Sequence, residues 1–193
     1  MMSHGLGHTF LCALSSYILH CAITADAQTP VFHPVPPLGS GVYTSEVTSA
    51  SIGFAGVANV HNVALSGSQD LAILIDPASS LQPEVRLQTE SGDLLASAQA
   101  VGAGESLFLQ GVTLNATDAY EVRVGGSSGT VGSYDIQFVV NAVMEEESLN
   151  VGANNDRASA QDLDVIAREV LFDDDLVWRS AVLGHADFLT QKD

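Results

Sequence analysis

The stretch AYEVRVGGSSGTVGSYDIQFVV, residues 119–140, decides the fold. Apolar and polar side chains alternate on both sides of a Gly/Ser-rich segment at residues 125–129. The apolar positions are Tyr120, Val122, Val124, Tyr134, Ile136, Phe138 and Val140. A period of two is typical of strands that bury one face. Two such strands around a short Gly/Ser segment predict an antiparallel hairpin.

A hairpin alone is marginally stable in water, so its apolar face needs further strands. Strand-like segments precede it at residues 43–47, 49–54, 60–65, 71–75, 85–87, 94–98 and 106–114. The run LAILI at 71–75 is apolar throughout, which predicts a strand covered on both faces. Ser91-Gly92-Asp93 indicates a turn, and Gly111 indicates a bulge. The sequence therefore predicts an all-β fold, an antiparallel β-sandwich or jelly roll of about eight strands.

The composition limits the possible fold and the possible partners of the protein. The chain has 193 residues, 46% of them apolar and 15% charged, which predicts one packed domain with flanking segments. Six Lys and Arg against 23 Asp and Glu give a net charge of −17. Such a charge argues against nucleic acids and anionic membranes as partners, because their phosphates attract basic residues. Basic partners, cations or simple solubility stay open.

Residues 1–27 have the pattern of an export signal. An apolar region at residues 10–23 is followed by Ala25-Asp26-Ala27, an A-x-A cleavage pattern, although the N-terminal region carries His4 and His8 instead of Lys or Arg. The apolar region is too short for a membrane span. Cys12 and Cys21 both lie in this segment, so cleavage leaves a chain without cysteine. We expect a secreted or cell-surface protein.

The remaining chain divides by composition. Residues 28–41 carry four of the six prolines, at Pro30, Pro34, Pro36 and Pro37, and are predicted to be a linker. Residues 42–143 are the expected domain. Residues 144–193 carry 12 of the 23 acidic residues and are expected to be a poorly ordered acidic tail. Ile166, Val170 and Leu171 predict a short helix within 165–172.

The order of segments resembles the bacterial pre-peptidase C-terminal domain family, whose members are β-sandwich modules of secreted proteases and surface proteins. GVANVHNVAL at residues 56–65 is similar to the family's first core strand, ESGDLLASA at 90–98 to its turn motif, and residues 120–138 to its last strand pair. Asn59 and His61 stand where the family usually has Asp and Tyr. Residues 145–164 and 180–188 resemble the start of a second module.

The same resemblance implies a calcium site. In collagen-binding relatives the equivalent acidic lead-in binds Ca²⁺, which here nominates Glu145, Glu147, Asn155 and Asp156. Carboxylate and amide oxygens are also the hard ligands that Ca²⁺ prefers. No other cofactor is expected. The alternative is a solvated charged linker.

Motifs for catalysis are missing from the sequence. There is no G-x-S-x-G elbow, no H-E-x-x-H and no cysteine spacing for zinc. His61 lies in an expected strand, where a lone histidine is typically structural. We therefore expect no enzyme. Two functions stay open: an accessory module that binds an extracellular or cell-envelope protein or polymer, or a neighbouring domain; and a structural spacer or folding aid within a larger surface protein.

Overall fold

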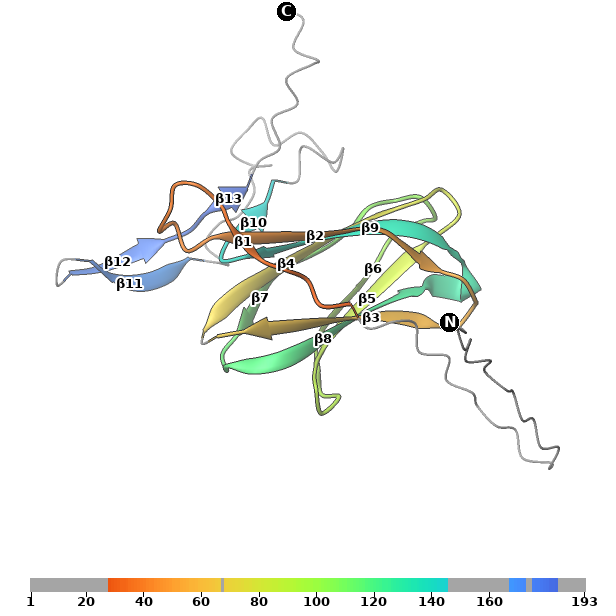
Figure 1. The fold of residues 1–193 in the computed structure, drawn as a ribbon, viewed down its shortest axis with the longest axis horizontal. Helices are drawn as coiled ribbons and strands as arrows, with labels where there is room; N and C mark the ends of the chain where they lie inside the picture. The colour runs from red at the N-terminus through yellow and green to blue at the C-terminus, as the bar shows by residue number, and fades with distance from the viewer. Residues whose placement is uncertain (1–27, 67, 146–166, 173–174, 184–193) are drawn as a thin grey trace, which may run out of the picture.

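The computed structural model describes residues 28–66, 68–145, 167–172 and 175–183 (Figure 1). Two antiparallel sheets lie face to face, one in the order β1-β2-β9-β4-β7 and the other in the order β3-β8-β5-β6. The first contains β1 His33–Pro34, β2 Tyr43–Ile52, β9 Gly132–Val140, β4 Gln69–Pro77 and β7 Leu107–Leu114. The second contains β3 Ala58–Leu65, β8 Asp118–Gly126, β5 Pro83–Thr89 and β6 Leu94–Gln99. The prediction of an all-β sandwich is confirmed.

Alternating side chains of both sheets fill the space between them. Val122 and Val124 of β8 and Ile136 and Phe138 of β9 are fully buried in one common cluster. Burial of a Val, Ile or Phe side chain stabilises the fold by about 1.5–3 kcal/mol. The period-two pattern therefore identifies the core-facing residues correctly, and the shared cluster holds the two sheets together.

The predicted hairpin at residues 119–140 is wrong. β8 pairs with β3 and β5, whereas β9 pairs with β2 and β4 in the opposite sheet. The connection contains a short 3₁₀ turn, Ser127–Gly129, and crosses from one sheet to the other. Alternation shows only that each strand buries one face. It does not distinguish two strands that lie side by side from two that face each other across a core.

Other local predictions are confirmed. The segments predicted at residues 43–47 and 49–54 form one strand, β2 Tyr43–Ile52, with an irregularity between Val47 and Ala50. Gly111 has a φ of 69° at a register shift in β7, as expected of a bulge. The backbone N–H of Gly92 donates to the carbonyl of Thr89 at 2.9 Å in the predicted β5–β6 turn.

The proline-rich segment predicted to be a linker contacts the sandwich from its first described residue. The N–H of Gln28 donates to the carbonyl of Val60 at 3.0 Å, and the N–H of Asn62 donates to the carbonyl of Gln28 at 2.8 Å. Phe32 packs edge-on against Phe138, with ring centroids 6.4 Å apart. The segment thus reaches β3 of one sheet and, through β1, β2 of the other.

A second apolar cluster lies outside the core, and we call it the outer cluster. Its buried members are Val42, Ala72, Val139, Ala142 and Met144, and Val35, Leu74, Phe108, Ala181 and Leu183 pack against them. It covers the outer face of β4, as the apolar run at 71–75 predicts. Part of this cover of β4 comes from residues distant in the sequence, Ala181 and Leu183. β13 Val182–Leu183 pairs in parallel with β10 Val143–Met144.

The short helix predicted within residues 165–172 is wrong over its described part. Arg168–Phe172 forms strand β11, which pairs antiparallel with β12 Asp175–Arg179. The apolar run is too short for periodicity to separate helix from strand, and Val170 and Phe172 favour a strand. In the described ranges, no helix is long and apolar enough to cross a membrane.

Candidate functional site

The predicted calcium ligands fall almost entirely outside the described residues. Glu145 is half-buried, and its N–H donates to the carbonyl of Leu183 at 3.1 Å. Glu147, Asn155 and Asp156 lie outside the described ranges. Within those ranges, no group of three or more His, Cys, Asp or Glu residues could hold a metal ion. The calcium site therefore stays a prediction.

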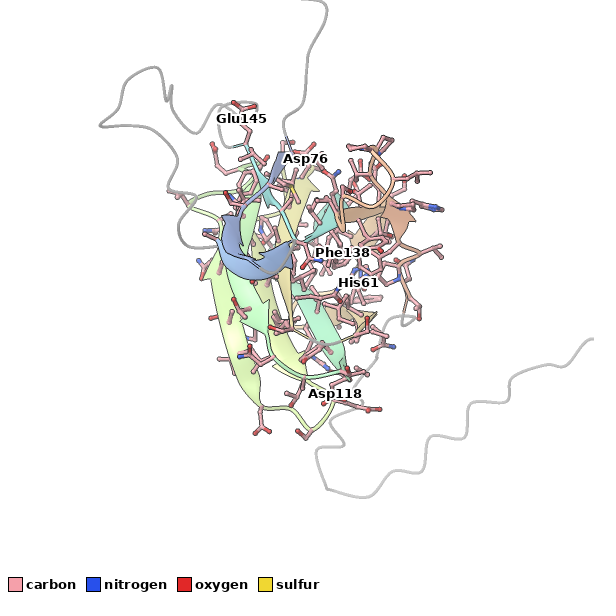
Figure 2. The ribbon with its side chains drawn as sticks, turned by 90° about the vertical axis from the view of Figure 1, so that its left-hand side faces the viewer. His61, Asp76, Asp118, Phe138 and Glu145 are labelled. Carbon is pink, nitrogen blue, oxygen red and sulfur yellow. The ribbon has the colours of Figure 1, made fainter. Side chains whose placement is uncertain are left out.

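A polar network in the middle of the core is the most distinctive arrangement of functional groups. His61 and Asn59 come from β3, and Tyr134 comes from β9 in the opposite sheet. His61 Nε2 lies 3.0 Å from the Tyr134 hydroxyl, and Asn59 Nδ2 donates to that hydroxyl at 2.9 Å. Asn59 Nδ2 also donates to the carbonyl of Ser51 in β2 at 3.0 Å. In Figure 2, His61 lies beside Phe138 in the interior, while Asp76, Asp118 and Glu145 lie toward the ends of the sandwich.

The hydrogen bonds around the Tyr134 hydroxyl determine which ring nitrogen of His61 carries the proton. The Tyr134 oxygen accepts from Asn59, so its single hydrogen remains for His61. If Tyr134 donates to Nε2, the ring carries its proton on Nδ1, and only Nδ1–H lacks a partner among the described residues. The other tautomer leaves two groups unmatched, Nδ1 and the tyrosine hydrogen. We therefore assign the Nδ1–H tautomer.

Burial keeps both rings neutral. Desolvation lowers the pKa of His61 from 6.5 to about 4. It also raises the pKa of Tyr134 from 10.0 to about 12, although the hydrogen bond from Asn59 acts in the opposite direction. His61 is 1% exposed and Tyr134 2% exposed, so neither side chain can reach a substrate. The network is thus a set of buried hydrogen bonds that joins the two sheets inside the core.

A second buried polar cluster joins the ends of three strands. Asp70 of β4 accepts a hydrogen bond from the Thr113 hydroxyl of β7 at 2.7 Å. Its backbone N–H and C=O bond to Asn141, which follows β9 and has a φ of 63°. Asn141 Nδ2 also donates to the carbonyl of Gly41 at 2.8 Å. Asparagine tolerates this left-handed backbone. Sequence reasoning missed the cluster, since its members are far apart in the chain.

Comparisons with known proteins give weak likenesses. No family model and no curated protein match the sequence. The pre-peptidase C-terminal domain of a collagenase from Bacillus anthracis is 18% identical, with 48% of this chain and 86% of that chain covered and a TM-score of 0.38. PliG of Aeromonas hydrophila, a periplasmic inhibitor of g-type lysozyme, is 12% identical, with 59% and 96% covered and a TM-score of 0.38. Likenesses of this size assign neither a family nor an activity to the chain.

Proposed function

We propose that this chain is a non-catalytic, exported β-sandwich module of the pre-peptidase C-terminal type, which binds an extracellular or cell-envelope protein or polymer. The observation that best supports a binding role is that buried side chains of both sheets fill the space between them. His61, the histidine of the expected strand, is buried and lies within hydrogen-bond distance of Tyr134 in the opposite sheet. A partner therefore meets the surface, through a sheet edge, a sheet face or the loops.

The residues behind the family resemblance support the proposed type. GVANVHNVAL overlaps β3, ESGDLLASA overlaps the β5–β6 turn and β6, and the last motif covers β8 and the first part of β9. Asn59 and His61, which differ from the usual residues of that family, are the two members of β3 that bond to Tyr134. The departures from the motif thus coincide with the polar network.

Export is supported by the position of Gln28. This residue follows the predicted cleavage pattern, and its backbone bonds to β3. Cleavage after Ala27 would leave the new N-terminus beside the sandwich, with the packing of Phe32 intact. N-terminal sequencing of the protein recovered from a bacterial host tests export. We expect a chain that begins at Gln28 outside the cytoplasm, and an uncleaved cytoplasmic chain would contradict the proposal.

The role as a binding module is tested with the purified protein. Collagen, chitin, peptidoglycan and envelope fractions are immobilised separately, and retention is measured over a range of protein concentrations. We expect saturable retention on at least one surface, and heat-unfolded protein serves as the control. Uniform absence of binding would leave the spacer role as the explanation.

A further inference from the structure

The two sides of the sandwich, where the edges of the sheets meet solvent, differ in how the chain covers them. On one side, Gln28 pairs with the outer edge of β3, and β1 pairs with the outer edge of β2. On the other side lie the edges of β7 and β6. β7 is protected by the bulge at Gly111 and by Gln110, whose side-chain oxygen accepts from the N–H of Met144 at 2.8 Å. β6 has a register shift beside Leu94, but no described segment pairs with its outer edge.

β6 has the composition of an edge open to pairing. Its sequence is LLASAQ, without a charge or a proline, and it pairs with β5 alone. Leu94 is 58% exposed and Leu95 43% exposed. Edge strands are usually protected from another chain by charges, prolines or bulges. Apart from a register shift beside Leu94, β6 lacks these protections over its length.

The ladder of β5 and β6 shows which backbone groups are free. The N–H of Ala100 donates to the carbonyl of Pro83 at 2.9 Å, so Ala100 faces β5. Backbone groups alternate in an antiparallel ladder, so Ala98 and Ala96 also face β5. Ser97 and Gln99 therefore direct their N–H and C=O groups away from β5. These groups have no backbone partner among the described residues.

The charged side chains near β6 are acidic at its two ends and basic at its centre. Glu90 and Asp93, both exposed, lie at the beginning of β6. At its end, Glu84 lies opposite Gln99, and exposed Glu105 follows Gln99 by six residues along the chain. Arg86, also exposed, lies opposite Ser97 at the centre. A partner strand would meet negative charge at both ends and a positive charge at the middle. A second copy of this chain would bring its own acidic ends to the same places, and each copy carries a net charge of −17.

We propose that β6 binds an extended segment of a partner protein as an added strand of the four-stranded sheet, and that this segment is uncharged over its centre and basic at both ends. The inference rests on the proposed binding role and names its partner. Main-chain hydrogen bonds to Ser97 and Gln99 supply affinity in this mode of recognition, and side-chain contacts supply specificity. Leu94 and Leu95 offer the apolar contact. A six-residue strand spans about 20 Å, which sets the spacing of the basic ends.

The test uses the full protein and a fluorescein-labelled peptide, Lys-Lys-Thr-Val-Thr-Ile-Thr-Lys-Lys, in a fluorescence anisotropy titration. We expect saturable binding that weakens as salt is added, since the flanking charges are exposed. Ser97→Pro removes a free N–H without removing a β5–β6 hydrogen bond, and we expect it to weaken binding at least tenfold. Ser97→Thr keeps the N–H and is the matched control, with an expected change below twofold.

A second variant keeps the test independent of how well Ser97→Pro folds. Asp93→Asn combined with Glu105→Gln leaves the backbone of β6 intact, and we expect it to weaken binding severalfold at low salt and to reduce the salt dependence. Absence of peptide binding by the unmodified protein, or equal binding by Ser97→Pro, would overturn the inference. So would a dimer, detected by sedimentation, that Ser97→Pro dissociates, because the occupant would then be a second copy. If the peptide fails while an immobilised polymer binds, this inference falls and the proposed function stands.

Discussion

His61 and Tyr134 belong to opposite sheets, and 3.0 Å separates His61 Nε2 from the tyrosine hydroxyl. The contact lies inside an apolar core, where an unpaired polar group costs about 1–3 kcal/mol. The aromatic ring of His61 also packs edge-on against Phe138, with centroids 5.9 Å apart. The pair therefore contributes both packing and a directional bond, which fixes how the two sheets face each other.

Removal of the Tyr134 hydroxyl tests the energetic role of the network. Tyr134→Phe leaves His61 Nε2 without a donor, while Asn59 keeps its bond to the carbonyl of Ser51. We expect the free energy of unfolding in urea to fall by about 1–3 kcal/mol. Tyr120→Phe is the matched control, because that hydroxyl donates only to the nearby Ala116 carbonyl, at 3.0 Å, and is partly buried. An equal loss for both variants would contradict a special role for Tyr134.

The pKa of His61 predicts how stability depends on pH. Burial lowers this pKa from 6.5 to about 4, so between these values the unfolded chain binds the proton more tightly than the folded chain. The contribution of His61 is complete above pH 6.5 and is lost as the pH falls toward 4. The full shift corresponds to on the order of 3 kcal/mol.

Comparison with His61→Gln isolates this contribution from that of the carboxylates. Free energies of unfolding are measured in urea at several pH values for both proteins. We expect the unmodified protein to lose stability faster between pH 6.5 and 4 than the variant, and the two curves to run parallel above 6.5. Parallel curves over the whole range would show that His61 is not held neutral by the fold.

The outer cluster predicts that the C-terminal segment stabilises the sandwich. Leu183 packs into this cluster, whereas its neighbour Val182 is 42% exposed. We expect Leu183→Ser to lower the free energy of unfolding by about 1–2 kcal/mol, since a partly buried apolar side chain is replaced by a polar one. Val182→Ser is expected to change it by about 0.5 kcal/mol or less. Equal effects would show that β13 does not pack on the outer cluster in solution.

The connection between the two sheets leaves no space for a side chain at Gly126. A Cβ atom at this position would overlap the carbonyl oxygen of Thr130, which is backbone and cannot move aside. We expect Gly126→Ala to destabilise the protein by more than about 2 kcal/mol, measured by chemical denaturation. Gly53→Ala is the control, because nothing lies within 4 Å of the added atom. A tolerated Gly126→Ala would mean that residues 125–129 take another path, such as the hairpin that the sequence suggests.

The sequence predicts the strands of this fold better than their pairing. Alternation identifies Val122 and Ile136 as core residues because burial acts on each strand separately. It does not reveal that both edges of β8 are already occupied, by β3 and β5, which leaves no place for β9. Pairing partners depend on which strands compete for an edge, and that competition involves residues distant in the chain.

The candidate sites are likewise only partly predictable from the sequence. His61 is recognisable in the sequence as a strand histidine, but its partner Tyr134 lies 73 positions away and in the other sheet. The exposed edge of β6 cannot be seen in LLASAQ, because the same letters suit a strand paired on both sides. It becomes visible only in the structure, where Gln28 pairs with β3 at the opposite edge of the same sheet and Met144 bonds to Gln110 of β7 in the other sheet.

We infer that the interior of the sandwich is structural and that partners bind its surface. The most direct measurement is a pH titration of the ¹⁵N-labelled protein by nuclear magnetic resonance, which follows the ring nitrogens of His61. We expect a neutral ring with its proton on Nδ1 and a pKa of about 4. A His61 ring that titrates at its ordinary pKa of 6.5 would contradict a buried structural role, because the side chain would then be in contact with water.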